Sequence, residues 1–374
     1  MTGNSRPEIS LYFHVPFCTK KCDYCHFYVL PNKPELHTLL AEGFDKEIAL
    51  RSQELADKQV VSLYFGGGTP SLFGPKAIAR VIDQVAKYTP LAKETIEITL
   101  EANPEQISQS LMQEYAAVGI NRISLGVQSL DEALLKKLSR THGVQEALQA
   151  IERTVQSGIS NISIDLMYDI PGQTLETWEQ TLKRVETLPI THLSLYNLTI
   201  EPHTVFFKYR ESLAKELPDQ NTSLAMYLTA IQMLSQHGLS QYEISAFARA
   251  GLHSRHNIGY WTGRPFLGFG PSAFSYWEGV RFRNIAHIHK YIQKLREGTF
   301  PIDFSEQLEP DKMQRELLAI GLRVLEGVEL SAFSELEPTI KELETHKLVE
   351  RAGSKLRLTP RGVLVYDSVA SEIV

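Results

Sequence analysis

The sequence predicts an α/β protein built on a parallel barrel, complete or partial. Six short β-rich apolar runs alternate with helical stretches over the first half of the chain. Each run is continuously apolar, which is typical of a parallel strand that is covered on both faces. A helix between successive strands of one parallel sheet is the repeating unit of such a barrel.

The six runs and the helices between them can be placed in chain order. The expected strands are ISLYFHV, VVSLYFGG, TIEITLEAN, RISLGVQS, NISIDLMYD and HLSLYNLTI. Between them, residues 35–54, 75–89 and 175–188 carry apolar side chains at helical spacing. Pro75 stands near the start of the second helix, a position that proline favours.

The remainder of the chain predicts a smaller C-terminal domain. Two helical stretches precede a short hairpin at Leu348–Leu358, an order typical of a winged-helix-like domain. Residues 315–374 carry eight Lys/Arg against ten Asp/Glu, which argues against phosphate binding there. We therefore expect a core barrel at 1–205, a linking region with an aromatic-rich motif at 206–305, and the winged-helix-like domain at 306–374.

Composition and charge limit the cellular compartment and the binding partners that we expect. The formal net charge of −6 argues against broad binding to nucleic acid or to anionic membranes. No apolar run approaches the length of a membrane span. The first ten residues, MTGNSRPEIS, lack the apolar core of a signal peptide. We expect a cytoplasmic protein with no membrane span and no nucleic-acid partner.

The chain contains three cysteines, and all lie within eight positions after the first expected strand. Cys18, Cys22 and Cys25 have the spacing C-x3-C-x2-C, and an odd number of thiols makes a poor disulfide framework. Zinc would take a fourth ligand from His14 or His26. A [4Fe–4S] cluster would be left with one iron open to a further ligand. The spacing alone leaves both possibilities open.

Polar residues and glycines recur where the other apolar runs finish. GGGTP follows the second run, Glu101 ends the third, Gln128 ends the fourth and Asp165 lies within the fifth. Chemistry in parallel barrels sits at the carboxyl ends of the strands. The glycines either let the backbone approach a ligand, exposing N–H groups to it, or simply turn the chain.

Longer phrases carry a family resemblance over essentially the whole chain. They are FHVPFC, CTKKCDYC, LYFGGGTPS, ISLGVQSL, IDLMYDIPGQT, NLTIEP and HNIGYW. With them the chain resembles the radical S-adenosylmethionine (SAM) superfamily. Within it, the chain looks like the branch that contains oxygen-independent coproporphyrinogen III oxidases and haem chaperones of the HemW type.

The resemblance implies a partial (β/α)6 barrel of radical SAM type and a set of site residues. Cys18, Cys22 and Cys25 would hold a [4Fe–4S] cluster whose fourth iron binds SAM. Glu101 would accept from the ammonium of SAM, Arg140 would pair with its carboxylate, and Asp165 would accept from ribose hydroxyls. The implied SAM contacts are Tyr12, Tyr24, Gly67, Gly68, Thr69, Glu101, Gln128, Arg140 and Asp165.

Within the branch, the residues favour the chaperone over the oxidase. The oxidase has a further cysteine two positions after the third, where this chain has Phe27, and it has a longer N-terminal segment. The resemblance therefore implies haem binding and transfer to an unnamed acceptor protein. It assigns no catalytic residue, and an electron donor is implied only if SAM is cleaved. The alternatives are coproporphyrinogen III dehydrogenase activity and a sensor that binds the cluster and SAM without haem.

The HNIGYW motif suggests a haem ligand. His256 precedes Tyr260, Trp261, Phe266 and Phe269, which offer aromatic surface, and haem iron commonly takes an imidazole. The aromatic residues by themselves favour a packing cluster in which His256 is a hydrogen-bonded structural residue. The resemblance to the haem chaperones instead implies that His256 binds the iron, with His253 and His203 as alternatives.

Two positions depart from the family pattern. Asp169 and His203 stand where glycine is usual, close to two strand ends.

Overall fold

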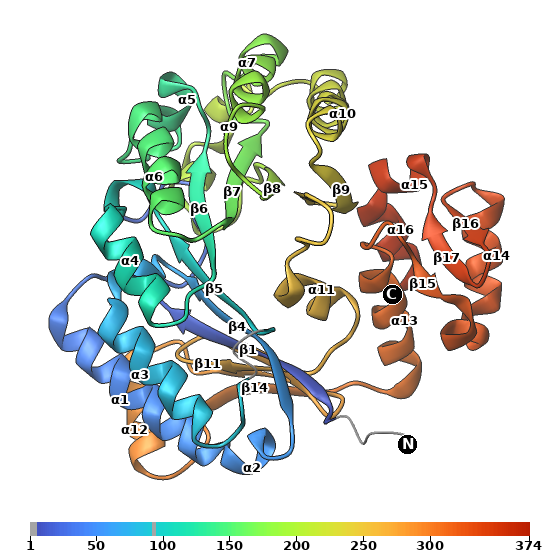
Figure 1. The fold of residues 1–374 in the computed structure, drawn as a ribbon. Helices are drawn as coiled ribbons and strands as arrows, with labels where there is room; N and C mark the ends of the chain where they lie inside the picture. The colour runs from blue at the N-terminus through green and yellow to red at the C-terminus, as the bar shows by residue number, and fades with distance from the viewer. Residues whose placement is uncertain (1–5, 92–94) are drawn as a thin grey trace.

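A computed structural model describes residues 6–91 and 95–374 (Figure 1). Residues 1–5, the first half of the stretch that is expected to lack a signal peptide, lie outside the described residues. One open sheet has the strand order β14-β13-β12-β11-β1-β4-β5-β6-β7-β8-β10-β9. Its parallel run is β1 (Glu8–Val15), β4 (Gln59–Gly67), β5 (Glu97–Ala102), β6 (Arg122–Gln128), β7 (Asn161–Tyr168) and β8 (His192–Asn197). These strands coincide with the six predicted runs and form a partial barrel.

Helices cover the outer face of the sheet (Figure 1). They are α1 (Pro34–Leu50), α2 (Ser52–Leu55), α3 (Pro75–Ala86), α4 (Gln109–Ala117), α5 (Glu132–Lys137), α6 (Val144–Gln156), α7 (Leu175–Val185) and α10 (Gln220–Gln236). The predicted apolar faces point inward, because Leu40, Phe44 and Ile48 of α1 are fully buried. The ring of Phe44 meets Phe13 of β1 edge to face at 5.5 Å, which fixes the helix on the strand.

Residues 206–305, predicted as a linking region with an aromatic-rich motif, widen the same sheet at both edges. The sheet gains β11 parallel to β1, a run of antiparallel strands beyond it, and β10 antiparallel to β8. The elements are α8 (Val205–Lys208), α9 (Arg210–Leu213), β9 (Ser240–Glu243), β10 (Ala246–Ala248), α11 (Arg255–Trp261), β11 (Phe266–Phe269), β12 (Phe274–Trp277), β13 (Val280–Asn284), α12 (Ile288–Arg296) and β14 (Ile302–Gln307). The domain limits themselves stay a prediction.

A buried carboxylate ties this extension to α1. Glu47 is fully buried and accepts hydrogen bonds from Gly270 N at 2.9 Å, from the Asn284 side chain at 2.7 Å and from the Tyr291 hydroxyl at 2.7 Å. Arg51, itself buried, lies 3.6 Å from the same carboxylate. The Glu47 carboxylate thus accepts hydrogen bonds from three positions that are far from α1 in the chain, and it joins the sheet edge to the helix layer.

The C-terminal residues form a separate core with a winged-helix-like order. The elements are α13 (Pro310–Gly321), β15 (Val328–Glu329), η3 (Leu330–Leu336), α14 (Glu337–Thr345), β16 (Val349–Ala352), β17 (Lys355–Leu358), α15 (Pro360–Leu364) and α16 (Tyr366–Ile373). The predicted hairpin is the β16–β17 pair, to which β15 adds a third strand. Arg323 joins the domain to the barrel by pairing with Glu243 and lying over the Trp261 ring.

Two short paired strands, β2 (Phe17–Cys18) and β3 (Leu30–Pro31), close the cysteine-containing loop. Two short 3-10 helices, η1 (Pro70–Leu72) and η2 (Pro104–Gln106), follow β4 and β5 respectively. In the described part of the chain, no helix combines the length and the apolar character needed to cross a membrane.

Candidate functional site

A pocket of about 370 Å³ lies at the carboxyl ends of the parallel strands. All three cysteines line it. So do most of the residues predicted to contact SAM, which are Tyr24, Gly67, Gly68, Thr69, Glu101, Gln128, Arg140 and Asp165. The parallel register explains the convergence, because consecutive strand ends meet at one edge of the sheet.

The cysteine loop is held in place at both its base and its tip. The β2–β3 pairing closes the base, with Phe17 opposite Leu30. At the tip, Asp23 N donates to the Ser139 hydroxyl at 2.9 Å, and the Asp23 carbonyl accepts from Phe206 N at 3.0 Å. The thiols are therefore presented to the pocket by a loop whose backbone is fixed by three other segments.

Burial makes these thiols reluctant to ionise on their own. Burial raises the pKa of Cys18 to about 11, although the Thr69 hydroxyl 3.6 Å from its sulfur opposes the rise. Burial also raises the pKa of Cys25. Across residues 6–91 and 95–374, no three His, Cys, Asp or Glu side chains are placed to hold a single metal ion. All three thiols nevertheless line one pocket.

The glycine turn after β4 packs against the cysteine strand. A Cβ on Gly68 would lie 2.7 Å from the Phe17 carbonyl oxygen, and one on Gly67 would lie 2.6 Å from the His14 ring. The N–H groups are already used, since Gly67 donates to Glu101, Gly68 to the Val15 carbonyl and Thr69 to the Phe17 carbonyl. The predicted contact of Gly67, Gly68 and Thr69 with SAM stays an untested prediction. The glycines allow the close approach of two backbones.

Arg140 connects the cysteine loop to two strand ends. Its guanidinium donates to Cys22 Sγ at 3.4 Å, to Asn103 Oδ1 at 2.8 Å and to the Gly126 carbonyl at 2.8 Å. Its Nε is buried without a partner in the described structure. A partly buried cation therefore lies directly beside the sulfur of Cys22.

Two partly buried carboxyl groups face the pocket. Burial raises the pKa of Glu101 to about 7, and the charge of Asp165 adds to the rise. Burial likewise raises the pKa of Asp165 to about 6. Glu101 accepts from the Tyr64 hydroxyl at 2.7 Å, and Asp165 accepts from the Ser124 hydroxyl at 3.2 Å. Both groups would be stabilised as anions by a bound cation.

Tyr12 is the one predicted SAM contact that does not line this pocket. Its hydroxyl is hydrogen-bonded to the His14 ring at 2.9 Å, and its ring stacks on Tyr64. Sequence reasoning missed Asn103 and Tyr196, which do line the pocket. Asn103 directly follows β5 and Tyr196 lies near the end of β8, so a systematic reading of strand ends would have found both.

The two departures from the family's glycines have a structural explanation. Asp169 has φ of 61° and His203 has φ of 65°, so both adopt the left-handed conformation that glycine takes most readily. Asp169 is buried, and its carboxylate accepts from the Asn197 side chain and the Ser223 hydroxyl. His203 is exposed.

His256 lies in the protein interior. It is 1% exposed, its Nδ1 is hydrogen-bonded to the Ser62 hydroxyl at 2.9 Å, and its Nε2 to the Tyr260 hydroxyl at 2.8 Å. Burial lowers its pKa to about 3. Iron could bind this ring only if one of those hydrogen bonds were broken, so the assignment of His256 as haem ligand stays an untested prediction.

Two family models match the chain. One described as Radical SAM superfamily covers residues 12–185, and one described as HemN C-terminal domain covers residues 308–365. A Bacillus subtilis protein named Heme chaperone HemW is 32% identical over 96% of this chain and 97% of its own length. The zebrafish (Danio rerio) mitochondrial Radical S-adenosyl methionine domain-containing protein 1 is 32% identical over 98% of this chain and 87% of its own.

The architecture matches a solved structure. The structure titled "Coproporphyrinogen III oxidase (HemN) from Escherichia coli is a Radical SAM enzyme" superposes with a TM-score of 0.84. It covers 99% of this chain and 90% of that one at 23% identity, so it establishes the shared fold.

Proposed function

Because the chain belongs to the radical SAM superfamily, in the group of HemW-like proteins, we propose that it is a haem chaperone that binds haem and passes it to an acceptor protein. The observation that carries this proposal is the match to proteins named Heme chaperone HemW over nearly the full length of both chains. Both family models fall on parts of the chain that the structure shows as ordered units, the barrel and the C-terminal domain.

The pocket at the strand ends fits a [4Fe–4S] cluster and SAM. Cys18, Cys22 and Cys25 would hold the cluster, since three thiols line one pocket that also contains a partly buried cation. When bound, the cluster and SAM together supply radical chemistry that the protein's own side chains lack.

The chain's own residues hold and orient these groups. Glu101 and Asp165 provide partly buried carboxylates for the ammonium and hydroxyl groups of SAM, and Arg140 provides a cation for its carboxylate. Gly67, Gly68 and Thr69 hold the wall beside the cysteine loop, while Tyr24 and Gln128 complete the lining. Tyr12 acts indirectly through the Tyr64 ring that it stacks on.

Phe27 separates this proposal from the oxidase alternative. It lines the pocket and is 54% exposed, at the position where the oxidases have a further cysteine. An exposed phenyl ring offers no ligand or acid–base group, so we propose that coproporphyrinogen III is not a substrate. The haem acceptor is a further protein, an electron donor is required only if SAM is cleaved, and the site of action is the cytoplasm.

The proposal is tested with purified, anaerobically reconstituted protein. Haem titration should saturate at about one haem per chain, with a Soret band that survives gel filtration. A parallel sample with SAM, a reductant and coproporphyrinogen III should release no carbon dioxide. Failure of the folded protein to retain haem would remove the chaperone function, and loss of two carboxylates per substrate would establish the oxidase.

A further inference from the structure

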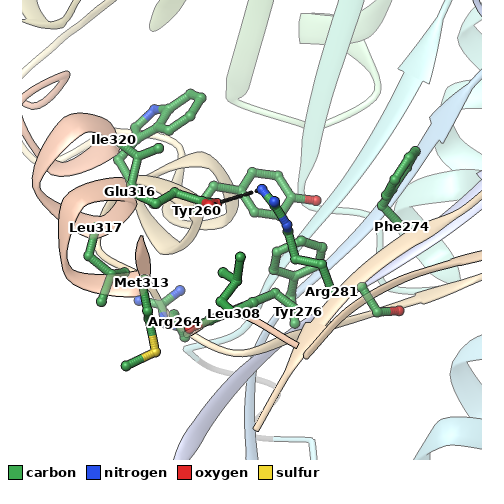
Figure 2. A pocket seen from close by; sticks show the side chains of 14 residues that line it. Tyr260, Arg264, Phe274, Tyr276, Arg281, Leu308, Met313, Glu316, Leu317 and Ile320 are labelled. Carbon is green, nitrogen blue, oxygen red and sulfur yellow. Dashed lines mark hydrogen bonds and ion pairs between the residues drawn. The ribbon is translucent and has the colours of Figure 1, made fainter. Parts of the chain in front are cut away.

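Arg281 and Arg140 each line a cavity, and the two side chains are held in different ways. Figure 2 shows Arg281 at a cavity of about 220 Å³ between α11, the β12–β13 hairpin and α13. It pairs with Glu316 at 2.9 Å and with Glu306 at 2.7 Å, so carboxylates balance its charge. Arg140 lines the pocket at the carboxyl ends of the parallel strands, which we call the strand-end pocket, and it donates to two neutral oxygens and to Cys22 Sγ. Its guanidinium therefore contacts a cysteine sulfur where Arg281 contacts carboxylates.

Asn103 joins Arg140 to a second cysteine. It directly follows β5 and lines the strand-end pocket. Its Oδ1 accepts from Arg140 at 2.8 Å, and its Nδ2 donates to the Thr69 hydroxyl oxygen at 3.2 Å. That hydroxyl oxygen lies 3.6 Å from Cys18 Sγ, while Arg140 Nη1 lies 3.4 Å from Cys22 Sγ. The three side chains therefore form one hydrogen-bonded chain between the two sulfurs.

Donor and acceptor chemistry fixes the direction of each hydrogen bond in this chain. A guanidinium can only donate, so Asn103 turns its Oδ1 toward Arg140 and its amide N–H₂ toward Thr69. Because the Thr69 oxygen accepts from that amide, its single hydroxyl proton can point at Cys18. Both cysteine sulfurs thus receive a hydrogen bond, which is an interaction that the sulfurs of an iron–sulfur cluster accept.

The strand end that carries Asn103 is joined a second time to the segment that carries Arg140. Glu105, in η2, accepts from the Thr141 hydroxyl at 3.0 Å, and its other carboxylate oxygen lies 3.4 Å from His142 Nδ1. Burial opposes ionisation of Glu105, but the contact with His142 is among those that lower its pKa to about 2. A charged carboxylate therefore braces residues 140–142 against η2, and this keeps Arg140 within reach of Asn103.

We propose that Asn103 is a positioning residue for the [4Fe–4S] cluster, which holds the Thr69 hydroxyl and the Arg140 guanidinium against the sulfurs of two cluster ligands. The inference rests on the proposed cluster site and deepens it. The reduction potential of an iron–sulfur cluster depends on hydrogen bonds to its sulfurs, because donors stabilise the added negative charge of the reduced form. Asn103 supplies no ligand atom, so it acts on the potential through its two neighbours.

The test is a redox titration of the reconstituted full-length protein, in which dithionite gives one electron to the cluster and electron paramagnetic resonance reports the reduced form. Asn103→Ala should lower the equilibrium constant for reduction about tenfold, which for one electron is a shift of about 59 mV to more negative potential. It should also lose iron to a chelator severalfold faster. Thr69→Val, which removes the hydroxyl proton at nearly constant size, should shift the potential in the same direction. The Asn103→Ala/Thr69→Val double variant should shift it by less than the sum of the two single shifts, because Asn103 acts through Thr69.

Asn197→Ala is the matched control, because Asn197 lines the same pocket and its side chain donates to Asp169 instead of to this chain. Its potential and its rate of iron loss should equal those of the wild type. A shift in Asn197→Ala as large as that in Asn103→Ala would show a general effect of the pocket wall and would overturn the inference.

The outcomes separate this inference from the cluster site on which it rests. Wild-type protein that binds no iron would remove the proposed cluster and this inference together. A wild-type potential and rate of iron loss in Asn103→Ala loaded with about four irons would overturn the inference alone. Additive shifts in the double variant would do the same. If Asn103→Ala retains too little cluster for titration, Thr69→Val decides, since an unchanged potential there would overturn the inference.

Discussion

At the scale of single residues, the site depends on how burial changes acid–base behaviour. The thiols and carboxyl groups of the strand-end pocket are held away from water, so their charged forms are costly until a cation arrives. Arg140 is the partly buried cation that already touches a thiol. The pocket is therefore arranged to bind positively charged groups tightly, and its empty form carries an electrostatic cost.

The cysteines should hold iron jointly. Replacing Cys18, Cys22 or Cys25 with Ala should reduce iron in the reconstituted protein from about four atoms per chain to a small fraction, because three thiolates hold one cluster. Iron analysis and the broad visible absorption measure the loss. Phe27→Ala is the matched control, since Phe27 lines the same pocket without a ligand atom, and its iron content should stay unchanged. One zinc per chain in colourless wild-type protein would contradict the cluster.

Glu101 should make the cofactor-free protein less stable as the pH rises. Burial raises its pKa from 4.5 to about 7, so between these values the folded state keeps a proton that the unfolded state releases. The free energy of unfolding should fall by up to about 3 kcal/mol from pH 4.5 to pH 7, at about 1.4 kcal/mol per pKa unit. Asp165, whose pKa is raised to about 6, acts in the same direction.

Urea unfolding at several pH values from 4.5 to 8 measures this slope. Glu101→Gln should flatten it, whatever the variant's absolute stability. Glu114→Gln, an exposed change on α4, should leave it as in the wild type. If the free energy of unfolding changes with pH equally in the wild type and in Glu101→Gln, Glu101 does not titrate in this range.

Residue positions that follow from strand order were predictable, and burial was not. Glu101, Gln128 and Asp165 were found because parallel strands end at one edge of the sheet. His256 looked available because the motif shows only that it lies four residues before Tyr260. The hydrogen bond to Ser62 and the packing against Tyr64 come from a strand almost 200 positions away, and no local pattern reports such contacts.

At the scale of elements, the repeating strand–helix units were predictable and the sheet extensions were not. Continuous apolar runs identify parallel strands because both faces are covered. The antiparallel strands β12 and β13 carry mixed side chains on a partly exposed edge, so their pattern is weak. A hairpin signal was nevertheless present, since Glu278 and Gly279 between them both have positive φ, as a tight two-residue turn requires.

The left-handed position of His203 predicts a stabilising substitution. A residue with a Cβ pays about 1 kcal/mol or more in this conformation, and glycine does not. His203→Gly should therefore have a free energy of unfolding about 1 kcal/mol above that of His203→Ala, which keeps the Cβ. Chemical denaturation of the two variants measures the difference, and a more stable alanine variant would contradict the assignment of strain.

The Glu47 cluster should hold the sheet extension to α1. Glu47→Gln places an amide N–H₂ among groups that donate and leaves buried Arg51 without its closest buried partner. We expect a loss of about 3 kcal/mol in the free energy of unfolding. Glu54→Gln removes a partly exposed partner of the same arginine and should cost less than about 1 kcal/mol. Equal losses of unfolding free energy in the two variants would contradict the expectation that the buried partner of Arg51 contributes more than the partly exposed one.

At the scale of the whole molecule, the barrel and the C-terminal domain together form two separate cavities. The strand-end pocket is the proposed site for the cluster and SAM, and a larger cavity lies where α11 of the barrel meets the C-terminal domain. The sequence predicted the first region from strand ends. It could not predict the second, because a cleft between domains depends on how they pack, which Arg323, Glu243 and Trp261 determine here.

Transfer of haem to an acceptor protein tests the proposed chaperone function directly. Protein loaded with haem and freed of excess by gel filtration is mixed with a haem-depleted b-type haemoprotein and an excess of a protein that traps free haem. The acceptor should regain its Soret band and activity from the loaded protein, whereas an equal amount of free haem should be lost to the trap. Equal recovery from both sources, or no recovery from the loaded protein, would contradict a chaperone function.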